Sequence, residues 1–305
     1  MVPRLFDLHC DTAVRLYAKK QSIVKNPFHM SLEAASVFPS YLQIMAVWSD
    51  KTLSDEEAWQ RFLAVTDYLQ DDTQKNGFPL LTDGKNLPPQ GHFLAVEDAR
   101  LLGGVSGRVG ILYERGVRFL TLVWGGESHI GGAHDTNVGL TDYGRRILYE
   151  CFALGIIPDI SHASRKTANE VLSLAAKAGK PVIATHSNAF AVCPHTRNLT
   201  DEQFLAIRQS GGIVGLCLCP SHLCTEPKNA SAQNVLCHLD HWLSIGGEDT
   251  VALGCDLDGT DLPNGFSDIS DLARLAETMS GHGYTDTQIK KIFWLNAVNF
   301  VKNYI

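Results

Sequence analysis

Short apolar runs alternate along the chain with segments in which apolar residues recur at helical spacing. Eight runs consist mainly of Val, Ile, Leu, Phe and Ala. Runs that are apolar at consecutive positions are typical of strands buried on both faces, as in a parallel sheet. We predict strands at residues 5–8, 42–48, 93–96, 117–123, 156–160, 182–184, 213–218 and 251–254.

Helix start and stop signals separate most of these runs. Ser54 with Glu57, and Thr200 with Gln203, have the spacing of a capping box. Helices are predicted after Ser54, Ser164, Thr200 and Thr285 and over residues 234–245, with Gly179, Gly211 and Gly246 following three of their ends. Residues 77–90 and 125–141 read as loops. Eight strand–helix units predict a (β/α)8 barrel of the TIM type, with an open doubly wound sheet as the alternative.

Composition limits the class of protein. The 305 residues are 45% hydrophobic, which suits a globular fold, and we expect a single domain over residues 1–305. The net charge of −7 and the lack of a Lys/Arg run argue against nucleic-acid or membrane partners. No apolar stretch approaches the roughly 20 residues of a spanning helix, and no secretory signal is visible. We therefore expect a cytoplasmic protein with reduced, mostly buried cysteines.

Metal-ligand residue types follow five of the predicted strands. They are His9 and Asp11, Glu97, His162, His186 and Asp256, in chain order. Because the carboxyl ends of barrel strands meet at one face, we expect these side chains to converge there.

The spacing of these residues suggests roles. His9 and Asp11 are two positions apart, so their side chains can point the same way and coordinate one ion. His162 and His186 can coordinate a second ion through imidazole nitrogens. Glu97 can bridge the two ions, which leaves Asp256 to handle a proton. Two ions about 3.5–4 Å apart with a bridging hydroxide form a hydrolytic centre.

Each residue alone has a simpler interpretation. His162 could be a buried histidine, Asp256 a turn residue and Glu97 a helix N-terminal charge. The ordered repetition at five strand ends favours a metal hydrolase. Arg197 could bind a substrate carboxylate or be a solvated loop residue. His129 and His134, in the Gly-rich loop, could contact substrate or be exposed.

These residues lie in ordered motifs that match a known family. The motifs are at residues 7–12, 95–97, 116–122, 139–144, 158–164, 185–187, 197–203, 238–241 and 256–259. On them the chain resembles the membrane dipeptidase (renal dipeptidase) family, peptidase family M19, among the amidohydrolase-like barrels. The resemblance covers nearly the full length.

The resemblance implies a metal-dependent dipeptidase with two zinc ions. It implies His9 and Asp11 as ligands of one zinc, His162 and His186 as ligands of the other, and Glu97 as the bridging carboxylate. It further implies that Asp256 is the acid/base and that Arg197 holds the C-terminal carboxylate of the dipeptide. Family members often accept a D-residue at that position. Mn, Co or Fe could occupy the same ligands. A homodimer is the expected assembly.

Two positions depart from the family pattern. Trp124 stands where the family has a histidine that contacts substrate, and His129 is a candidate replacement. A substrate-contacting tyrosine has no match after the seventh strand, where His222 stands instead. The alternatives are therefore an amidohydrolase acting on a cyclic amide, lactone or N-acyl compound, or a metal-binding protein on the same barrel without turnover.

Overall fold

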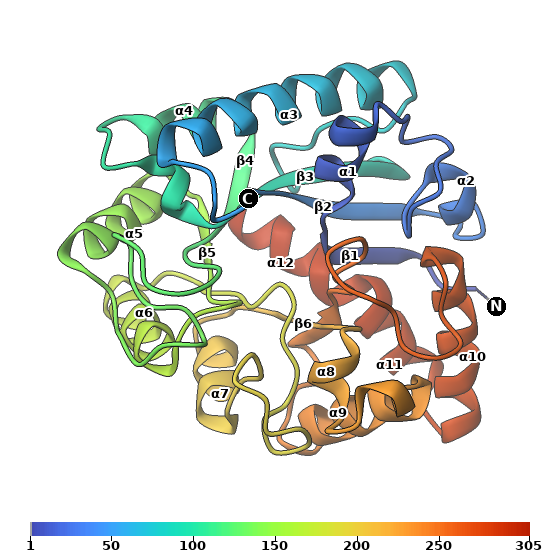
Figure 1. Ribbon diagram of the computed structural model, residues 1–305. Helices are drawn as coiled ribbons and strands as arrows, with labels where there is room; N and C mark the ends of the chain where they lie inside the picture. Colours follow the sequence, from blue (N-terminus) through green and yellow to red (C-terminus); the bar gives the residue numbers. More distant parts are fainter. Residues whose placement is uncertain (1) are drawn as a thin grey trace.

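The computed structural model describes residues 2–305 and confirms the predicted barrel (Figure 1). Seven parallel strands form one curled sheet in the order β5-β4-β3-β2-β1-β7-β6. The strands are β1 (Leu5–Cys10), β2 (Tyr41–Trp48), β3 (Gln90–Glu97), β4 (Val117–Thr121), β5 (Ile157–Asp159), β6 (Val214–Leu216) and β7 (Val251–Leu253). The first and last strands pair with each other, as a closing sheet requires.

Residues 183 and 184 join the two edges of this sheet. Ile183 forms a parallel bridge to Asp159 of β5, and Ala184 forms one to Val214 of β6. The regular strand predicted at residues 182–184 is thus replaced by isolated bridges. Directly after these bridges the carbonyl of Thr185 packs on Gly215 and Gly254, where a Cβ atom would collide with it.

Helices cover the outside of the barrel. They are α1 (Thr12–Lys19), α2 (Leu32–Ala35), α3 (Asp55–Lys75), α4 (Arg108–Glu114), α5 (Asp142–Leu154), α6 (Arg165–Ala178), α7 (Asp201–Gln209), α8 (Pro220–Leu223), α9 (Ala232–Ser244), α10 (Leu272–His282), α11 (Asp286–Lys290) and α12 (Asn296–Tyr304). Short 3-10 turns lie at Ala99–Leu102, Pro227–Asn229 and Ile269–Asp271, and a π-helical segment at Lys291–Leu295 joins α11 to α12. Within residues 2–305 no helix is long and apolar enough to cross a membrane.

The predicted helix caps are confirmed. The side chains of Ser54, Ser164, Thr200 and Thr285 each accept a hydrogen bond from the backbone N–H three residues on. The helix predicted at residues 234–245 begins earlier, at Ala232. Asn234 is not its first residue but accepts the backbone N–H of Ser231, which fixes the start of the helix.

Two apolar layers hold the barrel together, one between strands and helices and one inside the barrel. Phe93 of β3 belongs to the inner layer, and Phe300 of α12 joins it at one end. The side chain of Asn296, at the start of α12, donates to the carbonyl of Val251, the first residue of β7. Helix α12 therefore closes the amino end of the barrel.

Candidate metal centre

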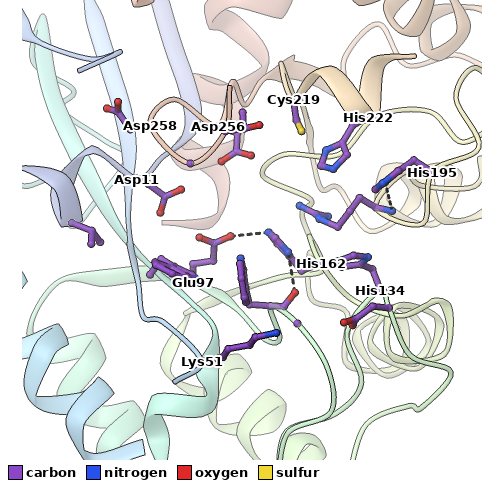
Figure 2. A pocket seen from close by; sticks show the side chains of 18 of the residues that line it. Asp11, Lys51, Glu97, His134, His162, His195, Cys219, His222, Asp256 and Asp258 are labelled. Atoms are coloured by element: carbon purple, nitrogen blue, oxygen red, sulfur yellow. Dashed lines mark hydrogen bonds and ion pairs between the residues drawn. The ribbon is translucent and has the colours of Figure 1, made fainter. Parts of the chain in front are cut away.

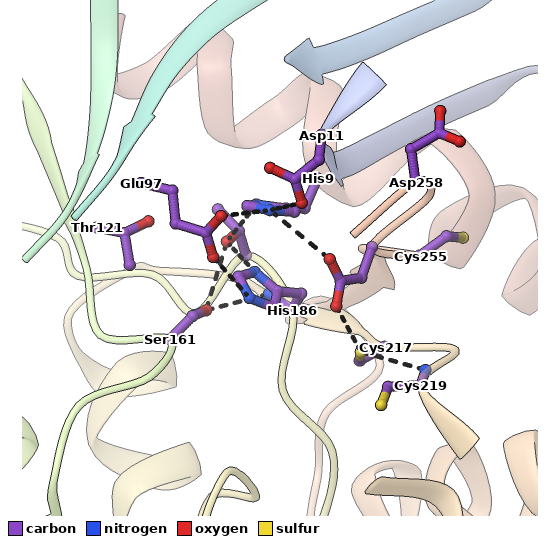
Figure 3. Close-up of polar contacts among 12 residues, drawn as sticks. His9, Asp11, Glu97, Thr121, Ser161, His186, Cys217, Cys219, Cys255 and Asp258 are labelled. Atoms are coloured by element: carbon purple, nitrogen blue, oxygen red, sulfur yellow. Dashed lines mark hydrogen bonds and ion pairs between the residues drawn. The ribbon is translucent and has the colours of Figure 1, made fainter. Parts of the chain in front are cut away.

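The ligand-type residues predicted from the strand ends converge at the carboxyl end of the barrel (Figures 2 and 3). His9 lies on β1 and Asp11 directly after it, Glu97 ends β3, His162 follows β5, His186 follows the 183–184 bridges, and Asp256 follows β7. All six are buried or largely buried. Strands far apart in the chain thus deliver imidazoles and carboxylates to one place.

Two groups of possible ligands share Glu97. His9, Asp11 and Glu97 form one group, and Glu97, His162 and His186 form the other. Oε2 of Glu97 lies 3.7 Å from Nε2 of His9, whereas Oε1 lies 2.8 Å from Nε2 of His162 and 3.6 Å from Nε2 of His186. Each carboxylate oxygen faces a different group. This is the arrangement a carboxylate between two cations needs.

A change of register on β1 turns His9 toward this cluster. Phe6 and Leu8 face the inside of the barrel, so simple alternation would turn His9 outward. The pairing of β1 with β2 shifts register between Asp7 and Cys10, which reverses the alternation. Cys10 consequently packs in the outer apolar layer.

The protonation states of His162 and His186 suit metal binding, whereas the charges of Glu97 and Asp11 raise the pKa of His9 against the effect of burial. Burial, reinforced by the positive charge of Arg197, lowers the pKa of His162 and of His186 well below the usual value, so both rings are neutral. Nδ1 of His162 donates to the carbonyl of Trp124 at 3.1 Å, which leaves its Nε2 lone pair free. Nε2 of His9 and Oδ1 of Asp11 are buried without a hydrogen-bond partner in the described chain. The donor set therefore fits divalent cations.

The carboxylates of the cluster repel one another. Burial raises the pKa of Asp256 to about 8; His9 opposes this shift, and Asp11 and Glu97 add to it. Burial together with the charge of Glu97 also raises the pKa of Asp11 to about 6. A cation among these side chains would relieve the repulsion.

Backbone strain gathers at the same end of the barrel. Asp98, His162, Asp256 and Asp258 all have positive φ angles, between 60° and 84°. Each such residue costs about 1–3 kcal/mol and persists where the surroundings force it. Four strained residues after three strands, two of them members of the cluster, are typical of a functional site.

A cavity of about 580 Å³ opens over the cluster. Arg197 lines it and is 5% exposed, and both terminal nitrogens of its guanidinium lack a hydrogen-bond partner among the described residues. The interpretation of Arg197 as a solvated loop residue is therefore wrong. A buried, unpaired guanidinium facing a cavity is suited to bind an anionic group.

The histidines predicted to contact substrate separate into two kinds. His222 lines the cavity, whereas His129 is not among the lining residues. Nδ1 of His129 instead lies 3.7 Å from Asp55, and its ring packs against Tyr143. His134 from the same loop does line the cavity, with Nδ1 3.0 Å from the hydroxyl of Thr196. The loop therefore brings His134, and not His129, to the site.

Sequence reasoning assigned no role to a layer of polar groups beneath the histidines. Asp159, Thr121 and Thr185 are buried there, and both threonine hydroxyls donate to the Asp159 carboxylate. In the sequence Thr185 directly precedes His186 and Asp159 lies three positions before His162, whereas Thr121 has no histidine beside it. That signal is weak, because Thr and Asp also occur at strand ends for turn formation.

The comparisons with known proteins agree with this geometry. The model of the family described as membrane dipeptidase (peptidase family M19) matches residues 3–304. An uncharacterized protein in the pqqA 5′ region of Klebsiella pneumoniae is 35% identical over 219 residues, which cover 68% of this chain and 80% of that protein.

Two solved structures overlay the whole chain. The dipeptidase AC, a metallopeptidase of family M19, has a TM-score of 0.92 and 28% identity, covering 100% of this chain and 99% of its own. A metallopeptidase from Rhodobacter sphaeroides, liganded with a phosphinate mimic of the dipeptide L-Ala-D-Ala, has a TM-score of 0.92 and 27% identity, covering both chains completely. The chain belongs to the membrane dipeptidase family, peptidase family M19, and is a metal-dependent dipeptidase.

Proposed function

We propose that this protein is a binuclear zinc dipeptidase that accepts a D-residue at the C-terminal position of its substrate. One observation carries the proposal. The two ligand groups that share Glu97 and the unpaired guanidinium of Arg197 face the same cavity. A centre that attacks an amide thus lies beside a group that binds a carboxylate, and a dipeptide has both.

The ligands divide between two positions. His9 and Asp11 would hold one ion, His162 and His186 would hold the other, and Glu97 belongs to both ligand groups. Neutral imidazoles with carboxylates suit zinc, and Mn, Co and Fe accept the same donors. When bound, the ions supply Lewis acidity and lower the pKa of a shared water toward 7.

Asp256 moves the proton in this proposal. Its Oδ1 lies 3.9 Å from Nε2 of His9, at the edge of the ligand cluster and in the wall of the cavity. Burial raises the pKa of this carboxyl to about 8, and bound cations would oppose that shift, so the ionised carboxylate is available to accept a proton and to release it again. It takes the proton of the attacking water and delivers it to the leaving amine.

Arg197 limits the length of the peptide that the site accepts. Its guanidinium binds the C-terminal carboxylate of the substrate in a bidentate contact. A longer peptide places an amide where this carboxylate belongs, and it leaves a buried charge without a partner. His222 and His134 line the cavity near this arginine and contact the residue that carries the carboxylate.

The proposed tolerance of a D-residue has support from a relative. The Rhodobacter sphaeroides metallopeptidase binds a mimic of L-Ala-D-Ala, and its fold matches this chain from end to end. In this chain Trp48 and Trp124 wall the cavity with ring centroids 5.1 Å apart. The two indoles can therefore determine which substrate side chains the cavity accepts.

A substrate panel tests the proposal. Zinc-loaded protein is assayed against L-L and L-D dipeptides, with N-acetylated and C-amidated versions of the same peptides and a chelator blank. We expect chelator-sensitive cleavage that requires a free C-terminal carboxylate and proceeds on at least one L-D dipeptide. Equal cleavage of amidated and free peptides would contradict the role of Arg197.

A second candidate is an amidohydrolase acting on a cyclic amide, lactone or N-acyl compound. Trp124 favours it, because this indole lines the cavity and stands where the family pattern has an imidazole that contacts substrate. Cleavage of cyclic or N-acyl substrates by a protein that leaves every dipeptide intact would favour this alternative.

A further inference from the structure

A buried carboxylate lies directly beneath the two ligand groups. Oδ2 of Asp159 accepts hydrogen bonds from the hydroxyls of Thr121 and Thr185, both at 2.6 Å. Its Oδ1 accepts the backbone N–H groups of Ser161 at 2.8 Å and Thr185 at 3.0 Å. Four donors fill the acceptor sites of this carboxylate, so its orientation is fixed.

The hydroxyl of Thr185 connects this carboxylate to the histidines. Its Oγ1 lies 2.8 Å from Nδ1 of His186 and 3.3 Å from Nδ1 of His9. A threonine hydroxyl has one hydrogen to donate, and the short contact to the Asp159 carboxylate uses it. Toward both imidazoles the same oxygen can therefore only accept.

This constraint fixes the tautomer of both rings. Nδ1 of His186 and Nδ1 of His9 must each carry hydrogen to bond to Thr185, which leaves both Nε2 atoms to face the ligand cluster, where Nε2 of His186 also lies 2.9 Å from Nε2 of His162. Those atoms face Glu97, at 3.6 Å from His186 and 3.7 Å from His9. The two rings lie 3.8 Å apart, close enough to share one acceptor (Figure 3).

The backbone holds Thr185 in place from the other side. Its carbonyl packs on Gly215 of β6 and on Gly254, which follows β7, and a Cβ at either position would overlap it. The backbone N–H of His186 donates to the Ser161 hydroxyl at 3.1 Å. These contacts fix the backbone of Thr185, and the hydrogen bond to Asp159 orients its hydroxyl.

We propose that Asp159 and Thr185 act as a positioning pair that fixes the tautomers of His9 and His186 and so couples the two metal positions. The proposal rests on the two-ion centre proposed above, because His9 belongs to one ligand group and His186 to the other. A single hydroxyl orients one ligand of each ion. Its loss should therefore weaken both ions together, unlike a defect confined to one position.

Thr121 provides a matched control. Its hydroxyl donates to the same oxygen of Asp159 at the same 2.6 Å, and it is 1% exposed, as Thr185 is. Within residues 2–305 its hydroxyl bonds to no histidine. Thr121→Val and Thr185→Val thus remove equivalent hydrogen bonds from Asp159, and only the second also removes the acceptor of the imidazoles. Thr185→Ser keeps the hydroxyl.

The first measurement is zinc affinity, by competition with a chromophoric chelator, together with zinc content per chain. Outer-shell changes weaken metal binding by about 10–100-fold. We expect Thr185→Val and Asp159→Asn to weaken both ions by this factor, and Thr185→Ser and Thr121→Val to stay near wild type. Thermal unfolding should show similar losses of stability in Thr121→Val and Thr185→Val.

The second measurement reads the tautomers directly. Nitrogen–proton correlation spectra of ¹⁵N-histidine-labelled full-length protein distinguish Nδ1–H from Nε2–H rings, whether or not metal is bound. We expect Nδ1–H for His9 and His186 in wild type, Thr121→Val and Thr185→Ser. In the metal-depleted Thr185→Val protein we expect a mixture.

Several results would overturn the proposal. They are an equal loss of zinc in Thr121→Val and Thr185→Val, weakening of one ion only, or unchanged tautomers in Thr185→Val. Zinc affinity and tautomers are read without a substrate, so a wild type that binds two ions but cleaves no dipeptide would contradict the proposed function alone. If wild type fails to bind two ions, the tautomer spectra decide whether the positioning pair exists.

Discussion

The amino end of the barrel is filled by apolar side chains of α12, whereas the carboxyl end is filled by ionisable side chains, some without protein partners. At the amino end Val298, Phe300 and Val301 complete the inner apolar layer. At the carboxyl end His9, Asp11 and Arg197 have buried polar atoms with no partner in the described chain. One end of the barrel is thus suited to stability and the other to binding.

The backbone differs between the two ends in the same way. Positive φ angles of non-glycine residues occur at Asp98, His162, Asp256 and Asp258, after the strands, and otherwise only at the helix end Lys20 within the described chain. Strain and unpaired charge at one end must be offset by packing elsewhere. The comparison teaches that changes at the carboxyl end should alter chemistry first, and changes at the amino end stability first.

The largest effect on chemistry is expected from Asp256→Asn. Loss of a proton-transfer group lowers turnover by about 10²–10⁴-fold. The asparagine also removes one of the crowded carboxylates, so the protein should remain folded. The measurement is kcat on a cleaved dipeptide, with zinc content and thermal unfolding alongside.

Asp258→Asn is the matched control for Asp256→Asn. Asp258 is also buried with positive φ, but its oxygens accept from the hydroxyl of Thr12 and the backbone N–H of His29. Its replacement should lower stability and leave kcat within a few-fold of wild type. Full turnover in Asp256→Asn would remove Asp256 from the mechanism.

The converse test is Phe300→Ala at the amino end. Phe300 is 3% exposed in the inner apolar layer, and removing its ring should lower the free energy of unfolding by about 3–5 kcal/mol. Urea denaturation measures this loss. Lys302→Ala, an exposed change on the same helix, should have little effect. A fall in kcat/KM of the folded Phe300→Ala protein would show that the two ends are not independent.

His92 is an ionisable group near the amino end of the barrel, and we expect it to affect the free energy of unfolding and not the chemistry. Its ring is buried against Phe78, donates Nδ1–H to the Phe78 carbonyl at 3.0 Å, and has an unpaired Nε2. Burial lowers the pKa of His92 from 6.5 to about 4. The unfolded chain therefore binds the proton first, and stability falls as the pH drops from about 6.5 to about 4.

This pH effect amounts to about 3 kcal/mol of unfolding free energy across that window. Urea denaturation of wild type and His92→Phe at pH 7 and pH 4.5 measures it. The difference in stability between the two pH values should be smaller in His92→Phe, because that chain has no proton to bind here. Equal pH dependence in the two proteins would show that His92 does not contribute.

Much of the fold and the cluster could be predicted because the signals are local. Glu97 ends a run in which Phe93 and Ala95 face the barrel interior, so alternation alone places it at the mouth. Ser54 and Thr200 mark helix starts through the capping they perform. In each case a residue and its near neighbours in the chain carry the information.

The rest depends on contacts between distant segments. The register shift that turns His9 inward arises from pairing with β2, and no pattern within residues 5–10 reveals it. His129 and His134 lie in one Gly-rich loop, and only its folded path shows which of them reaches the cavity. Thr185 gains its role from Asp159 and His9, which lie 26 and 176 residues away in the chain.

The smallest of the expected effects concerns substrate selection at the carboxyl end. Charge-assisted hydrogen bonds contribute about 1.5–3 kcal/mol, so Arg197→Ala should raise KM about 10- to 100-fold for dipeptides with a free C-terminal carboxylate. Because the guanidinium is buried without a partner, its removal should not lower the midpoint of thermal unfolding. Lys51→Ala is the control, since this cation lines the same cavity but is exposed. If both variants raise KM equally, or if amidated peptides suffer the same loss, general charge attraction and not Arg197 selects the substrate.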